Sequence, residues 1–167
     1  SLTRFVNARF FHLAHLTDRM LSRLPVVFHA GTSAVAAHLR LPDLCPLPPG
    51  GEAYVQVELD EPMVVAPGDR FIVRRPAPAT TLGGGCVVAA DTRRMRRTRG
   101  NWGDQCRRRE EAFRQPETAL AYVLQDAGNR ALTLEEWAAA ALVEHGAAHE
   151  LAGKLAADGI AVALPGE

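Results

Sequence analysis

Hydrophobic and polar residues alternate with a period of two in several stretches of the first ninety residues. The clearest stretches run from Ser33 to Leu41 and from Ala53 to Leu59. A period of two is the side-chain repeat of a β-strand with one buried face. The positions expected to be buried are Val35, Ala37, Leu39, Leu41, Ala53, Val55, Val57 and Leu59, and those expected to point outward are Tyr54, Gln56 and Glu58.

Turn-forming residues separate these stretches from other extended segments. Residues 42–51 hold four prolines and two glycines and cannot form regular structure. A turn is expected at Pro67-Gly68, and a loop at residues 76–79. About six short strands with no helical pattern between them predict a closed antiparallel barrel, which leaves few exposed strand edges. The remaining predicted extended segments are a run that holds Phe5, Phe10, Phe11 and Leu13 and ends near His15, and residues 24–29, 70–74 and 86–90.

Three consecutive glycines, Gly83 to Gly85, directly precede the last of these strands and continue its extended pattern. Glycines inside a strand mark backbone that bends sharply or closely approaches another chain segment. The run lacks the lysine and hydroxyl residue of a phosphate-binding GxxxxGK[ST] loop. It therefore predicts barrel geometry rather than a nucleotide site.

Helical patterns replace the strands after Asp91. A partly helical stretch is expected over residues 105–115, and Pro116 begins a helix that runs to about Asp126 and ends at Gly128-Asn129. Thr133 and Glu136 form a capping box, which starts a second helix that carries Trp137, Ala140 and Ala141. The apolar stripe expected on the first of these two helices is Leu120, Val123, Leu124 and Ala127.

A third helix is predicted from Ala147 to about Asp158, after a break at Gly146 and with Gly159 as its C-cap. Ile160, Val162 and Leu164 then alternate as a strand. Three short helices followed by a strand is the order of a winged helix-turn-helix, here with an incomplete wing. The inward residues of the third helix are Ala148, Leu151, Ala152 and Leu155.

The predicted fold is therefore a mainly β, six-stranded antiparallel barrel followed by a small α/β winged helix-turn-helix domain. We place the barrel at residues 1–92, a basic and partly helical connector at 93–115, and the winged helix at 116–167. Residue 1 is Ser, not Met, and the chain ends at Glu167, so we expect it to be a piece of a larger protein.

Charge is distributed unevenly although the net charge is zero. Residues 1–90 carry 8 cations and 7 acids, residues 91–115 carry 9 and 4, and residues 116–167 carry 2 and 8. The connector can attract a polyanion or serve as a solvated linker, whereas the acidic C-terminal unit should be repelled by nucleic acid. A DNA-binding winged-helix regulator, the alternative from another functional class, needs several cations on its third helix, which has only Lys154.

No metal site, disulfide or catalytic arrangement is indicated. Cys45, Cys86 and Cys106 are widely spaced and are expected to be unpaired thiols in a reducing cytosol. The histidines, among them the pairs at 12 and 15 and at 145 and 149, lack neighbouring ligands at a recognisable spacing. No stretch is apolar enough for a membrane helix, and no signal-peptide pattern begins the chain, so we expect a soluble, cytoplasmic protein that binds no membrane.

Three motifs occur in the order typical of one family of translation factors. They are HxGT at residues 29–32, PGGExYVQxxLxxP at 49–62 and GDRFxxR…PxxTxGGG at 68–85. The first ninety residues resemble the third domain of factors of the elongation-factor-Tu type, and most closely SelB, the selenocysteine-specific elongation factors. In that family winged-helix domains follow the barrel. The third domain of another translational GTPase, such as an archaeal or eukaryotic initiation factor subunit, is the alternative within the superfamily.

The resemblance implies a whole protein that binds GTP and delivers selenocysteinyl-tRNA to the ribosome at a recoded UGA. Its distal winged-helix domains would bind an mRNA hairpin, and the winged helix in this chain would be a spacer between the barrel and those domains. GTP and Mg²⁺ are expected in an N-terminal domain outside this chain, which is therefore not expected to be an enzyme by itself and needs no cofactor.

The resemblance also implies that the outer face of the barrel meets the tRNA. Arginine donates paired hydrogen bonds to phosphate, so Arg74 and Arg75 are the leading RNA-binding candidates, with Thr80, Thr81 and His29 nearby. The alternative for Arg74 is structural, with its stem packed on the barrel and its guanidinium paired with an acid.

Overall fold

The computed structural model describes residues 2–21, 23–42, 46–90, 93–94, 101–128 and 130–159. The chain divides into two compact units, residues 1–107 and residues 108–167. Each unit is described by itself.

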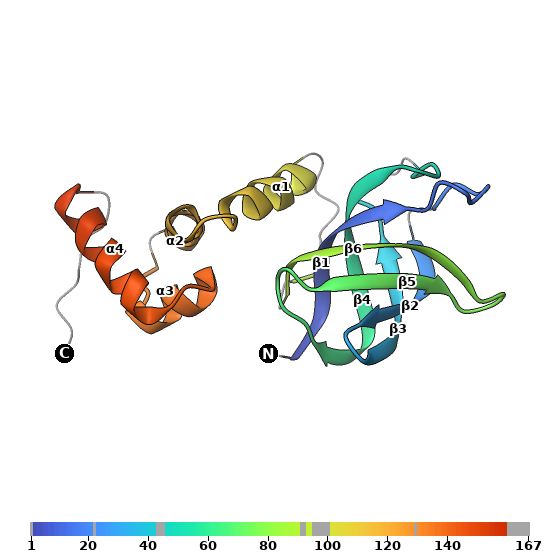
Figure 1. Ribbon diagram of the computed structural model, residues 1–167, viewed down its shortest axis with the longest axis horizontal. Coiled ribbons are helices and arrows are strands. Elements are labelled where there is room, and N and C mark those ends of the chain that lie inside the picture. Colours follow the sequence, from blue (N-terminus) through green and yellow to red (C-terminus); the bar gives the residue numbers. More distant parts are fainter. Residues whose placement is uncertain are drawn as a thin grey trace. The chain divides into compact units, whose positions relative to one another are not determined.

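The first unit is a closed barrel in which six strands pair in the order β1-β4-β3-β2-β5-β6 (Figure 1). Every neighbouring pair is antiparallel, and the sixth strand closes on the first. The six-stranded antiparallel barrel predicted from the alternating pattern is confirmed. The strands are β1 (Leu2–His12), β2 (Arg23–Ala30), β3 (Ser33–Arg40), β4 (Glu52–Val64), β5 (Arg70–Arg75) and β6 (Thr80–Ala89).

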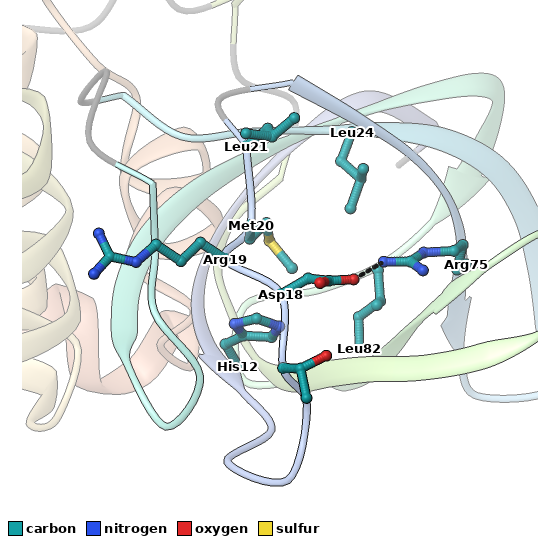
Figure 2. Close-up of a pocket in the computed structure, with 9 residues that line it drawn as sticks. His12, Asp18, Arg19, Met20, Leu21, Leu24, Arg75 and Leu82 are labelled. Atoms are coloured by element: carbon teal, nitrogen blue, oxygen red, sulfur yellow. Dashed lines mark ion pairs between the residues drawn. The ribbon is translucent and has the colours of Figure 1, made fainter.

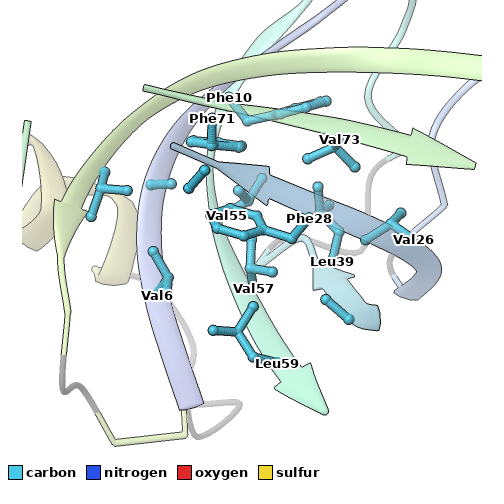
Figure 3. Close-up of a cluster of buried hydrophobic side chains, with 14 of the residues drawn as sticks. Val6, Phe10, Val26, Phe28, Leu39, Val55, Val57, Leu59, Phe71 and Val73 are labelled. Carbon is cyan, nitrogen blue, oxygen red and sulfur yellow. The ribbon is translucent and has the colours of Figure 1, made fainter. Parts of the chain in front are cut away.

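Side chains fill the interior of the barrel (Figure 3). Alternate residues of every strand point inward, as the period of two requires. The rings of Phe28 and Phe71 stack with centroids 5.0 Å apart, and that of Phe10 lies 6.4 Å from Phe71. The barrel is thus a packed core rather than a channel. The fully buried apolar side chains include Val6, Phe10, Phe28, Leu39, Val55, Val57, Leu59 and Val73.

Strand β4 extends further than the sequence pattern predicts, through Pro62 to Val64. Its register with β1 shifts between Thr3, which pairs with Met63, and Phe5, which pairs with Glu58. Pro62 falls within this irregularity and is not required to donate a ladder hydrogen bond, which proline cannot do. At the other end of the sheet, β1 stops at His12 rather than near residue 15.

The three glycines of β6 lie where neighbouring backbones come close, as predicted. A Cβ atom on Gly83 would overlap the carbonyl oxygen of Phe11, and one on Gly85 would overlap that of Arg9. A Cβ on Gly84 would be 2.5 Å from the carbonyl oxygen of Phe71 in β5. Strand β6 can therefore sit between β1 and β5 only because these positions have no side chain.

The second unit is helical. Leu120 and Ala148 are fully buried in its core, and the indole N–H of Trp137 donates to the backbone carbonyl of Leu120 at 2.9 Å. Residues Thr133 and Glu136 form the predicted capping box. The helices, the first of which begins before the unit boundary, are α1 (Trp102–Ala112), α2 (Pro116–Ala127), α3 (Leu134–Ala141) and α4 (His145–Ala157).

Two details of the helical prediction are wrong. Helix α1 begins at Trp102, three residues earlier than predicted. The break between α3 and α4 is made by Leu142, which adopts a left-handed conformation with φ 58°, and Gly146 lies in the first turn of α4. Gly159 is left-handed, with φ 69°, one residue after the cap Asp158. The strand predicted at Ile160, Val162 and Leu164 lies outside the described residues.

Among the described residues, no helix is long and apolar enough to cross a membrane.

Candidate nucleic-acid interface

The predicted RNA-binding residues come from three adjacent strands of the barrel. In the β2–β5 pairing, His29 lies opposite Ile72 and Val27 lies opposite Arg74. In the β5–β6 pairing, Arg74 lies opposite Thr81. Directly opposed residues of an antiparallel pair project from the same side of the sheet. Because the intervening Phe28 and Val73 are buried inside the barrel, His29, Arg74 and Thr81 share its outer face.

Arg75 and Thr80 lie apart from that outer face. They oppose each other at the end of the β5–β6 hairpin, on the side of the strand that carries the inward residue Val73. Arg75 contacts the carboxylate of Asp18 at 3.8 Å, and the hydroxyl of Thr80 donates to the carbonyl of Pro78 at 3.2 Å. The five predicted residues therefore form two groups, one on the outer face and one at the mouth of the barrel.

Arg74 is exposed, and the described part of the chain offers it no ion pair or hydrogen bond from its side chain. Among the described residues, no acid pairs with Arg74. It is the neighbouring Arg75 that makes such a pair. Ile72, half exposed two residues before Arg74, adds an apolar surface to the same face.

A pocket of about 410 Å³ opens at the mouth of the barrel beside Arg75 (Figure 2). Its wall includes His12 from the end of β1, residues 17–21 of the loop between β1 and β2, Leu24 of β2 and Leu82 of β6. The guanidinium of Arg75 and the carboxylate of Asp18 form an ion pair in the wall of the pocket, whereas the side chain of Arg19 extends away from that pair (Figure 2).

His12 has no role in the sequence-based predictions beyond the excluded metal site. In the structure His12 is only 2% exposed and its Nδ1 has no partner among the described residues. The period of two along β1 could have predicted the burial of His12. Every second residue of this strand is buried, namely Val6, Ala8, Phe10 and His12.

A second polar cluster fastens the first residues of the connector to the barrel. Gln56, predicted to point outward, is fully buried because its amide donates to the side chain of Asn7 at 2.9 Å and to the backbone carbonyl of Arg93 at 3.1 Å. Arg40 donates from Nε to the carboxylate of Glu58 at 2.8 Å, and Arg94 lies 3.9 Å from the same carboxylate.

These contacts shift the titration of Glu58. Partial burial would raise the pKa of its carboxyl, but the hydrogen bond and positive charge of Arg40, with the charges of Arg94 and Arg23, hold the pKa below its ordinary value. A carboxyl whose pKa is lower in the folded than in the unfolded state stabilises the fold above its unfolded pKa of about 4.3. That stabilisation decreases as the pH falls below this value and is lost once the pH falls through the lowered pKa of the folded state.

We expect Glu58→Gln to lower the free energy of unfolding of the barrel by about 1 kcal/mol at pH 7, because it removes a charge-assisted hydrogen bond at a partly exposed site. The difference from wild type should decrease as the pH falls below about 4.3, the unfolded pKa, and vanish below the lowered pKa of the folded state. Urea unfolding at several pH values measures it, with the exposed Glu61→Gln as control. A difference that stays constant as the pH is lowered through this acidic range would contradict this assignment.

The helical unit holds one cation among aromatic rings. The guanidinium of Arg109 lies 4.7 Å from the ring centre of Phe113 and 5.9 Å from that of Tyr122, joining α1 to α2. The only lysine, Lys154, contacts Glu150 at 3.0 Å. Helix α4 therefore presents little free positive charge.

Neither a metal centre nor a disulfide is found in the described ranges. No group of three or more His, Cys, Asp or Glu side chains gathers there, and neither Cys86 nor Cys106 forms a disulfide. Cys45 lies outside the described residues.

Comparison with known proteins supports the barrel assignment. Residues 7–94 match the family described as selenocysteine-specific elongation factor, β-barrel domain. A selenocysteine-specific elongation factor of Desulfomicrobium baculatum is 37% identical over 75 residues, which cover 45% of this chain and 12% of that protein. The crystal structure of translation elongation factor SelB from Methanococcus maripaludis, in its apo form, aligns with 52% of this chain and 23% of its own, at 19% identity and a TM-score of 0.46.

The family match covers more than half of the chain and contains all three motifs and five of the six strands in full. The resemblance predicted from the motifs is thereby confirmed. This chain belongs to the family of selenocysteine-specific elongation factors, and its residues 7–94 are their β-barrel domain.

Proposed function

We propose that the barrel binds selenocysteinyl-tRNA, and that the RNA backbone lies on the outer face formed by β2, β5 and β6. The observation that carries this proposal is Arg74. It is an exposed arginine beside Thr81, without a protein partner among the described residues, on a barrel of this family. A guanidinium that no carboxylate occupies can donate two hydrogen bonds to a phosphate.

The neighbours of Arg74 fit contact with an RNA backbone. The hydroxyl of Thr81 and the imidazole of His29 can both hydrogen-bond to phosphate or ribose oxygens. A single free arginine supplies modest affinity, so this face would add to contacts that other parts of the full-length protein make. Because this chain covers only 12% of its curated relative, GTP and Mg²⁺ binding, ribosome binding, an mRNA hairpin as partner and a cytoplasmic location are proposed for the whole protein.

We assign the helical unit a spacer or docking role toward modules that bind the mRNA hairpin. Its acidic residues outnumber its cations over residues 116–167, and Lys154 is already neutralised by Glu150. A helix that reads the major groove of DNA needs several cations for the flanking phosphates. Preference for duplex DNA over tRNA would therefore overturn the translation assignment.

The interface is tested by Arg74→Ala. We expect the affinity for selenocysteinyl-tRNA to fall several-fold, and the slope of log affinity against log salt concentration to decrease by about one, because one phosphate contact is lost. Electrophoretic titration at several salt concentrations, with elongator tRNA and random duplex DNA for comparison, measures both quantities.

Arg4→Ala is the matched control, because Arg4 is also an exposed strand arginine and belongs to β1, outside the proposed interface. It should leave tRNA affinity and salt slope close to wild type. If both variants weaken binding equally, the barrel attracts RNA through general charge, and the proposed face is wrong.

A further inference from the structure

We propose that the pocket at the mouth of the barrel binds a single unpaired RNA base, and that guanine is the base it fits best. The inference rests on the proposed function insofar as RNA is the ligand. It concerns a different surface from the phosphate contact at Arg74, and it specifies what part of an RNA the barrel would recognise.

The size and the apolar wall of the pocket suit a base. Its volume of about 410 Å³ falls within the range of roughly 300–1,000 Å³ that small-molecule sites occupy. Leu24, Leu82 and Met20 supply an apolar wall. An unpaired base has two flat faces that gain free energy when apolar or planar groups cover them.

The polar groups of the pocket place an acceptor beside a donor. The carboxylate of Asp18 only accepts hydrogen bonds and the guanidinium of Arg75 only donates them. Their 3.8 Å separation is longer than a hydrogen bond of about 2.7–3.2 Å, so each retains its capacity for a ligand. Guanine presents N1–H and an amino group as donors next to its O6 acceptor, which matches Asp18 and Arg75 together.

Other ligands fit this pair less well. Guanine has two adjacent donors for the two oxygens of Asp18, whereas adenine and cytosine have one amino group beside an accepting ring nitrogen, and uracil has one N–H between two carbonyl oxygens. A free phosphate would be repelled by Asp18 and would gain nothing from the leucine wall. The pocket is therefore better suited to a base than to a simple anion.

His12 is a buried polar group whose hydrogen-bonding capacity is not fully used. Its ring forms part of the pocket wall, and its Nδ1 lacks a hydrogen-bond partner within the described residues. A buried polar atom without a partner costs about 1–3 kcal/mol. A polar ligand in the pocket would give the imidazole a partner.

The position of the pocket also links it to the proposed interface. Arg74 and Arg75 are consecutive residues of β5, and their side chains leave the strand on opposite sides. A nucleotide could therefore place its phosphate near Arg74 on the outer face while its base turns over the strand end toward Arg75.

The proposal is tested with guanosine 5′-monophosphate as the probe. We expect saturable NMR shifts of the Leu24 and Leu82 methyl groups and of the His12 ring in the isotopically labelled 167-residue chain. The affinity should exceed that for adenosine, cytidine or uridine monophosphate by about tenfold, the scale of one paired base contact. Asp18→Asn should lower it about tenfold, because the amide replaces one of the two accepting carboxylate oxygens with a donating NH₂ group, which cannot accept from the N1–H or amino group of guanine.

Asp18 is largely exposed in a loop, so this variant should fold normally, and Glu61→Gln controls for the loss of one surface charge. Equal shifts with inorganic phosphate would show an anion site only, and equal affinity for all four nucleotides would exclude selection of guanine. Either outcome overturns the proposal. Guanosine monophosphate binding with unchanged tRNA affinity in Arg74→Ala would refute the outer-face interface while supporting the pocket.

Discussion

Gly85→Ala should destabilise the barrel by about 3 kcal/mol or more, toward the upper end of what a small-to-large substitution causes. The added methyl group would overlap the carbonyl oxygen of Arg9 and lie 3.1 Å from the Cα of Phe10. Both atoms belong to the backbone of β1, which cannot move aside without separating from β6. Because these two strands close the barrel, the loss should affect the whole unit.

Urea unfolding followed by β-sheet circular dichroism measures this loss, and amide hydrogen exchange locates it in β1 and β6. Cys86→Ala is the matched control, since it changes the next residue of the same strand to the same side chain and removes only a half-buried thiol. We expect it to cost under about 1 kcal/mol. Equal losses in the two variants would mean that the close approach at Gly85 is not what requires glycine.

Much of the barrel could be predicted because its signal is local. The alternation in residues 33–41 and 53–59, together with turn chemistry at Pro67-Gly68, indicates strands without knowledge of the partners. The three consecutive glycines also predicted that another backbone segment comes close to this strand. Which backbone comes close, that of Phe11, Phe71 or Arg9, depends on strand order, and pairing between distant segments leaves no local signal.

The predictions are wrong where contacts with residues distant in the sequence determine the conformation or the burial of a residue. Gln56 follows the outward phase of β4, but Asn7 and the carbonyl of Arg93 cover it. The bend before α4 was attributed to Gly146, the residue with the greatest conformational freedom. The chain instead places Leu142 in the left-handed conformation, since the packing of α3 against α4 sets the position of the turn.

The sequence predicted which segment of the chain holds the candidate site, but not which side chains form its pocket. The motif at residues 68–85 directed attention to the β5–β6 hairpin, where its four candidates oppose one another in two pairs, Arg74 with Thr81 and Arg75 with Thr80, and His29 lies on the adjacent strand β2. Strand alternation alone places Arg74 and Arg75 on opposite sides, which is the physical reason to separate a backbone contact from a base pocket. The contribution of Asp18 and His12 to that pocket required the folded barrel.

Leu120→Ala should unfold much of the helical unit at room temperature. Leu120 is fully buried, and truncating such a leucine costs about 2–5 kcal/mol. The unit spans only residues 108–167, and a domain of about this size is only marginally stable. The same residue accepts the indole hydrogen bond of Trp137, so shifts of the α2 backbone would also weaken the contact with α3.

Circular dichroism at 222 nm and the melting temperature of the helical signal measure this effect, while the β-sheet signal of the barrel should be unchanged. Leu142→Gly is the matched control, because Leu142 is an exposed leucine of the same unit with φ 58°. Glycine adopts that conformation without steric cost, so this variant should stabilise the unit by about 0.5–1 kcal/mol. If Leu120→Ala leaves the helical melting temperature unchanged, the apolar stripe of α2 does not hold this unit together.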